Sequence, residues 1–242
     1  NLGGVSKGGT LTVNHATAHP DGSFTLLGTV AGTAVFGLNG KTKTADASKG
    51  PYVYVVHFSA AGEYAWHAFF TSQAAFTADS IASFEDGSII AIGANAGALV
   101  FNDAGGKSFD SAEKPGIWAA RLSPSGAGQW ARTVVVREGT AAAQAVTAHE
   151  DGSASLTGGF TGTANLGPNG EVPVSVGTGE KQRDIWFEKL SKEGKLVWGG
   201  RVGGAGADVP GDVAPIKGGG LLLLANTAGT APNASDAKTT HQ

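Results

Sequence analysis

The chain repeats one tripeptide at 65-residue intervals, as Asp21-Gly22-Ser23, Asp86-Gly87-Ser88 and Asp151-Gly152-Ser153. Downstream residues keep the same interval, with a glycine seven positions after each Asp, a second glycine eleven positions after it, and then an apolar residue. By copy these are Gly28, Gly93 and Gly158, then Gly32, Gly97 and Gly162, then Phe36, Phe101 and Leu166. Self-similarity at a long fixed period is typical of a repeat architecture, in which one supersecondary unit is used several times.

A second motif lies in the later half of each copy and ends on tryptophan. It starts at Val53, Ile117 and Ile185, passes through a turn that contains Ser and Gly, and closes on Trp66, Trp130 and Trp198. Two apolar stretches joined by a short turn predict a β-hairpin. The Asp-Gly-Ser segments also lie between apolar stretches, and Asp and Gly both favour turns. Each copy therefore predicts two hairpins, or four strands.

Composition also favours an all-β chain. The 242 residues include 39 Gly, five Trp and eleven Phe, and only 15% are charged. No stretch sustains the apolar spacing of three and four that predicts a helix. The alanine-rich run 141–145 coincides with the start of the first strand in the other copies, so we interpret it as strand or loop.

Tandem four-stranded units are typical of the blades of a β-propeller, where each blade covers the apolar face of its neighbour. We therefore expect an all-β propeller built from blades of about 65 residues, with three complete copies and a partial fourth. The blades are expected at 1–70, 71–135, 136–201 and, in part, 202–231, followed by a polar C-terminal tail at 232–242.

Two segments of the third copy carry a resemblance to a known family. They are Asp184-Ile185-Trp186-Phe187-Glu188-Lys189-Leu190 with Gly194 and Trp198, and Asp151-Gly152-Ser153 with Gly158, Gly162 and Gly167. They resemble the bacterial β-propeller repeat of large secreted and cell-surface proteins, an SBBP-like repeat, and the resemblance extends over nearly the whole chain. It implies a propeller fold and an extracellular or cell-surface location, with the periplasm as the alternative. It implies no catalytic residues, because the family shares none.

The fourth copy departs from the pattern. It begins at Gly218-Gly219-Gly220, where Gly218 replaces the turn Asp, and its two strands are predicted near 212–216 and 221–225. Nothing after Gly229 resembles the tryptophan hairpin. Because three and a half blades do not close a ring, the open blade edge should pair with another chain. We expect either a piece of a longer propeller or a chain that closes on a copy of itself or on another subunit.

Charge and composition exclude several classes of partner and site. The formal charge is −3 and the 17 basic residues are scattered, so we expect no nucleic-acid partner. The apolar run 221–224 is far too short to span a bilayer, so we expect no membrane insertion. The absence of cysteine excludes disulfides and thiolate metal sites.

The polar residues form no recognisable catalytic pattern. His15 and His19 would lie about 13 Å apart on a strand, too far for two ligands of one ion. No Gly-x-Ser-x-Gly motif is present, and no Ser, His and Asp set recurs as a triad would. We therefore expect no catalytic residue, no metal and no cofactor, and a chain that is not an enzyme. An enzyme with its site on the propeller axis would need converging carboxylates or histidines.

Two binding functions remain. The first is a non-enzymatic binding or scaffold module of a secreted or cell-surface bacterial protein, which mediates protein–protein interaction or assembly. The alternative is lectin-like binding of polysaccharide, with one site per blade, for which Tyr54, Trp118 and Trp186 are the candidate residues. Because these aromatic residues recur in mid-strand, packing between blades is the competing interpretation, and their burial decides between the two.

Overall fold

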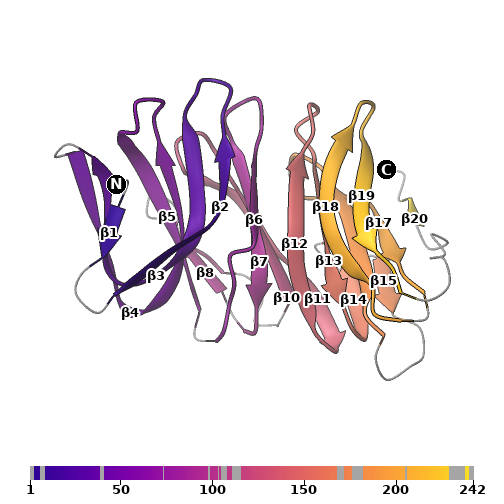
Figure 1. The fold of residues 1–242 in the computed structure, drawn as a ribbon. Coiled ribbons are helices and arrows are strands. Elements are labelled where there is room, and N and C mark those ends of the chain that lie inside the picture. Colours follow the sequence, from indigo (N-terminus) through magenta and orange to yellow (C-terminus); the bar gives the residue numbers. More distant parts are fainter. Residues whose placement is uncertain are drawn as a thin grey trace.

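The computed structural model is all-β, which confirms the expectation of an all-β chain. It describes residues 3–5, 9–38, 41–72, 74–97, 99–102, 104, 108–110, 116–167, 172–175, 182–204, 206–228 and 238–239. Within these ranges every regular element is a β-strand, and the sheets are antiparallel. The sheets stand in a row in chain order, with the first strands at one end and the last strands at the other (Figure 1).

Three sheets of seven, six and five strands follow one another, and we call the four consecutive antiparallel strands at the centre of each repeat units 1, 2 and 3. Unit 1 contains β2 (Thr10–Ala18), β3 (Phe24–Leu38), β4 (Lys41–Phe58) and β5 (Tyr64–Ser72). Unit 2 contains β6 (Ser80–Ser83), β7 (Ile89–Asn95), β10 (Gly116–Leu122) and β11 (Gly128–Glu138). Unit 3 contains β12 (Ala141–Ala148), β13 (Ala154–Phe160), β16 (Asp184–Leu190) and β17 (Leu196–Val202). Unit 4 is a hairpin of β18 (Val209–Ile216) and β19 (Gly220–Asn226). The alanine-rich run 141–145 is part of strand β12.

The remaining strands extend these sheets. The hairpin of β8 (Leu99–Asn102) and β9 (Ser108–Asp110) leaves unit 2 and pairs with β5 of unit 1. The hairpin of β14 (Thr163–Leu166) and β15 (Val172–Ser175) likewise leaves unit 3 and pairs with β11 of unit 2. Strand β1 (Gly3–Val5) pairs with the far half of β3. Strand β20 (Lys238–Thr239) pairs with β17, while the rest of the expected tail 232–242 lies outside the described residues.

The three units share one strand register around a buried aromatic side chain. Three glycines lie opposite these side chains: Gly28 opposite Tyr54, Gly93 opposite Trp118, and Gly158 opposite Trp186. A Cβ at any of the three glycines would stand 1.9–2.0 Å from a backbone carbonyl oxygen, that of Thr12 in β2, of Thr77 just before β6 or of Ala142 in β12. The Tyr54 hydroxyl and the Trp118 indole N–H donate to such carbonyls, at 2.9 and 3.0 Å. Glycine is therefore required here because the backbone and the ring leave no room for a side chain.

Each sheet has two faces, and we call the one toward the next unit the forward face and the opposite one the rear face. The forward face of unit 1 and the rear face of unit 2 bury a common cluster that includes Leu27, Val55, Phe70, Ile89 and Trp118. A second cluster fills the space between units 2 and 3. The hydrophobic core is thus a series of layers between sheets.

The tryptophan that closes a unit contacts the turn of the next unit's second hairpin. The Trp66 indole N–H donates to the Pro124 carbonyl at 2.8 Å, and its ring lies against Gly126. Trp130 repeats this contact with Lys192 and Gly194. Both glycines have a φ near +80°, and a Cβ there would stand 2.6 or 2.8 Å from the indole ring. Both turns therefore depend on glycine.

The aromatic side chains of the tryptophan hairpins differ in their burial. Exposed fractions are 1% for Tyr54 and Trp118, 0% for Trp186 and 8% for Trp66, whereas Trp130 and Trp198 are half-buried. Among the described residues, Trp198 faces no hairpin turn like that of Gly126 or Gly194.

Trp66→Ala is expected to lower the free energy of unfolding by about 3–5 kcal/mol, as truncation of a packed tryptophan does. Trp198→Ala is the matched control, because it has the same place in the motif without the contact to a following turn. Urea denaturation of both variants measures the difference. A loss at Trp198 as large as that at Trp66 would contradict a stabilising contact between units.

Candidate functional site

The Asp-Gly-Ser turns have a common geometry. In each, an Asp Oδ1 accepts a hydrogen bond from the Ser backbone N–H two residues on, at 2.9–3.0 Å. The backbone closes the turn, as His19 N–H donates to the Ser23 carbonyl at 2.8 Å, and the glycines have φ of 78–83°. Asp and Gly therefore occupy these positions because one accepts the local hydrogen bond and the other tolerates positive φ.

A row of basic side chains lies beside these turns, three positions after each mid-strand aromatic residue. The row consists of His57, Arg121 and Lys189. Buried Arg121 donates to the Gly152 carbonyl in the turn of unit 3 and, at 3.0 Å, to Ser88 Oγ of its own unit. Its guanidinium also lies 3.8 Å above the Phe84 ring and 3.7 Å from Asp86. Arg121 therefore joins the turns of units 2 and 3.

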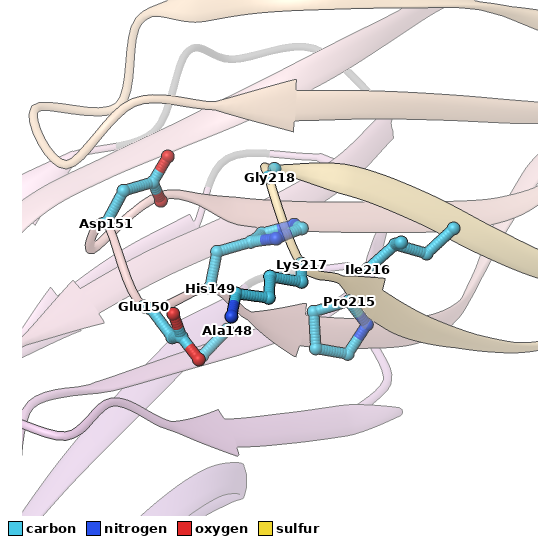
Figure 2. Close-up of a pocket in the computed structure, with 9 residues that line it drawn as sticks. Ala148, His149, Glu150, Asp151, Pro215, Ile216, Lys217 and Gly218 are labelled. Atoms are coloured by element: carbon cyan, nitrogen blue, oxygen red, sulfur yellow. The ribbon is translucent and has the colours of Figure 1, made fainter.

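Lys189 makes the equivalent connection between units 3 and 4. Its ammonium donates to Asp151 Oδ2 at 3.3 Å and to the Gly219 carbonyl at 2.9 Å. A cavity of about 300 Å³ lies between these two turns. Figure 2 shows His149, Glu150 and Asp151 on one side of the cavity and Pro215, Ile216 and Lys217 on the other.

The junction between units 1 and 2 has His57 in place of the longer cation. The His57 ring hydrogen-bonds to Thr25 Oγ1 at 2.9 Å and stacks on Trp66 with ring centroids 5.3 Å apart. His19 bonds to the same hydroxyl at 2.8 Å. A cavity of about 320 Å³, lined by both imidazoles and by Asp21 and Glu85, lies beside them. This cavity occupies the place where Arg121 and Lys189 join the turns of the later units.

Burial changes the protonation of these groups. Loss of solvent lowers the pKa of His19, His57 and His149 below the usual value, although a nearby carboxylate raises it in part. Burial alone would raise the pKa of Asp151, but hydrogen bonds from Ser153 and the Lys189 charge outweigh it and hold this pKa at about 2. At neutral pH the sites therefore combine neutral imidazoles with ionised carboxylates.

The structure places the candidate sugar-binding residues in the interior. Tyr54, Trp118 and Trp186 are at most 1% exposed, so none presents a ring face to a sugar. The packing interpretation accounts for these three residues. His15 is exposed on β2 and His19 is buried beside the turn. The described part of the chain holds no group of three His, Cys, Asp or Glu side chains arranged for a metal ion.

Sequence reasoning did not single out the basic row or the buried ion pair between units 2 and 3. In that pair, Arg132 Nη2 lies 3.1 Å from Glu188 Oε2, with side chains 5% and 0% exposed. The signal for the row was its constant offset from the mid-strand aromatic residue. No local signal marked the ion pair, because its partners belong to different copies.

Uncovered apolar surface is found at the two ends of the row of units. The large hydrophobic side chains that are exposed in the described residues are Val13 in unit 1 and Val209, Ile216, Leu222 and Leu224 in unit 4. Leu222 and Leu224 are 61% and 67% exposed, whereas the residues at the same register in unit 2, Ile90 and Ile92, are fully buried. The forward face of unit 4 therefore lacks the cover that the forward face of unit 2 receives.

The rear face of unit 1 is the other uncovered surface. Val13 pairs with Gly28 on this face and is 56% exposed. Around it lie the partly buried side chains of Leu11, Phe24, Leu26, Tyr52, Tyr64 and Phe69. Aromatic side chains are enriched in protein interfaces, so both ends of the row are candidate binding surfaces.

No family model matches the chain, and no curated protein matches it. None of the described residues forms a helix of the length and apolar character needed to cross a membrane.

Exchange of the basic residues tests the role of the row. His57→Arg is expected to raise the free energy of unfolding by about 1 kcal/mol, because a guanidinium there reaches the Asp21 carboxylate and the second turn. The reverse change, Arg121→His, should destabilise the chain, since the Gly152 carbonyl and Ser88 lose their donor. Urea denaturation compares both; stabilisation by Arg121→His would contradict the assignment.

The lowered histidine pKa values predict a pH dependence. An unfolded histidine gains its proton near pH 6.5, before the folded one does, so stability is complete above that pH and declines as the pH falls through the folded pKa. We expect weaker stability at pH 5.5 than at pH 7.5. His149→Gln should reduce this difference, and exposed His15→Gln serves as control. Asp151 contributes to stability in a lower pH range. Its contribution is lost as the pH falls from the pKa of the unfolded state to the folded pKa of about 2.

Proposed function

We propose that this chain is a non-enzymatic binding and scaffold module of a secreted or cell-surface bacterial protein, built as an arc of β-propeller blades. The arrangement of the units supports the propeller, because the first strands of consecutive units lie side by side in space. Strand β2 lies beside β6, β6 beside β12, and β12 beside β18. Blades around an axis bring their innermost strands together in this way. The SBBP-like motifs of the sequence support the location.

The distribution of exposed hydrophobic side chains carries the proposed function. They are confined to the rear face of unit 1 and to unit 4 in the described part of the chain. Concentrated apolar surface on a folded protein marks an interaction site, because water penalises its exposure. The module would hold its partners at the ends of a rigid arc.

Carbohydrate binding is the second candidate function. One observation favours it on the rear face of unit 1, away from the buried Tyr54, Trp118 and Trp186. The rear face of unit 1 carries a row of aromatic contacts, with Tyr52 and Phe69 rings 5.6 Å apart and Phe24 stacked on Phe58 at 5.2 Å. Flat aromatic surfaces with a polar edge suit sugar rings as well as proteins.

A photo-crosslinking amino acid at position 224 or 13 tests the first function in the cells that produce the protein. We expect covalent protein adducts from both positions. Gln129, exposed on β11, is the control position and should give none. Equal adduct formation at all three positions, or at none, would contradict a protein-binding role for the end faces. Polysaccharide adducts from position 13 alone would favour the second candidate.

A further inference from the structure

We propose that two copies of this chain associate head to tail, with the forward face of unit 4 of each copy on the rear face of unit 1 of the other. This inference rests on the proposed function, since it identifies the partner of the same end faces. The two faces are the two halves of a contact that the chain already makes internally.

The internal junctions show how a forward face receives a rear face. Between units 1 and 2, Leu27 and Val55 of the forward face pack with Ile89 of the rear face. Units 2 and 3 repeat the arrangement with Ile90, Ile92 and Leu156. Unit 4 in turn has its rear face on unit 3, where Val213 is only 7% exposed. Among the described units, one forward face, on unit 4, and one rear face, on unit 1, therefore have no neighbouring unit.

Strand β1 gives independent evidence about the rear face of unit 1. Between units 1 and 2, the outer strand β5 pairs with β8, with Phe70 opposite Phe101 and Thr71 opposite Val100. Phe36 and Val35 of β3 lie 65 residues before Phe101 and Val100. Strand β1 pairs with them, with Gly3 opposite Phe36 and Gly4 opposite Val35. It thus stands where the outer strand of a preceding unit would stand, beside a face arranged to receive another sheet.

The sizes of the side chains on the rear faces fit this pairing. Phe24 of unit 1 corresponds to Ile89 and Ala154 in the later units, and Tyr64 corresponds to Gly128 and Leu196. At these two positions the rear face of unit 1 carries larger side chains than the rear faces inside the chain. In the part of the chain that the structure describes, unit 4 consists of two strands, β18 and β19, and their forward face carries the exposed Leu222 and Leu224 against which these rings can pack.

Symmetry then determines the assembly. Each copy offers one face of each kind, so the contact is heterologous, and two such contacts related by a two-fold axis close a ring. The closed dimer would leave neither apolar end face in water.

Sedimentation equilibrium of the full chain tests the assembly. We expect twice the 24.1 kDa chain mass at micromolar concentration. Leu224→Asp and Val13→Asp should each raise the dissociation constant at least about 100-fold, because either carboxylate is buried in both contacts. Both residues are more than half exposed, so neither change disturbs the core. Gln129→Asp is the matched control and should remain dimeric.

Mixing the two variants gives the deciding result. The Val13→Asp chain keeps its forward face and the Leu224→Asp chain keeps its rear face, so an equimolar mixture should regain a mixed dimer that neither forms alone. A monomeric wild-type chain, sensitivity to Leu224→Asp without sensitivity to Val13→Asp, or no recovery on mixing would overturn head-to-tail association. If the wild-type chain is monomeric and positions 13 and 224 still crosslink to other proteins, the proposed function stands and self-association fails.

Discussion

The constraint on which this structure depends is that each sheet has two apolar faces and can cover neither by itself. Trp118 illustrates the solution: its ring lies over Gly93 of its own sheet, and its apolar surface packs with Phe70 of the preceding sheet, 4.5 Å away between ring centroids. Burial of such surface is the main favourable term in folding. Every sheet therefore needs a neighbour on each side, and the layered core follows from this need.

The polar contacts determine which sheet lies beside which. Because the apolar faces have similar compositions, hydrophobic packing alone would allow the sheets to stack in several orders. The junctions between sheets differ, however, in their charged residues. Arg132 requires Glu188 across the second junction, and that carboxylate also accepts the Gly167 N–H at 3.2 Å. A wrong order would leave one of these buried charges without its partner, which costs several kcal/mol. The ion pair therefore favours the native order of units more than it adds to stability.

The local chemistry of the turns and hairpins made much of the fold predictable. The Asp-Gly-Ser turns and the tryptophan hairpins are encoded within a few residues, so the strands of the three units followed from the spacing. The pairing of β8 with β5 was not predictable, because the partner belongs to the preceding copy and the repeated apolar residue Phe101 does not show which strand its segment pairs with. The role of Arg121 escaped for the same reason, since its acceptor, the Gly152 carbonyl, is supplied by another unit. Interactions within a copy leave a local sequence pattern, whereas interactions between copies leave at most a recurring residue, as in the basic row, whose partner the sequence does not identify.

The hairpins β8–β9 and β14–β15 each lie in one sequence copy but extend the sheet of the preceding copy. A sheet and a sequence repeat therefore do not contain the same residues. Because β8 and β9 complete the edge of unit 1 while lying within the second copy, a cut at the repeat boundary would remove two strands from a sheet that otherwise stays intact. A single sequence copy therefore does not contain all the strands of one sheet. Truncation keeps the sheet of unit 1 complete only when the cut falls after β9, so the shortest segment with this whole sheet also includes β6 to β9 of the next copy.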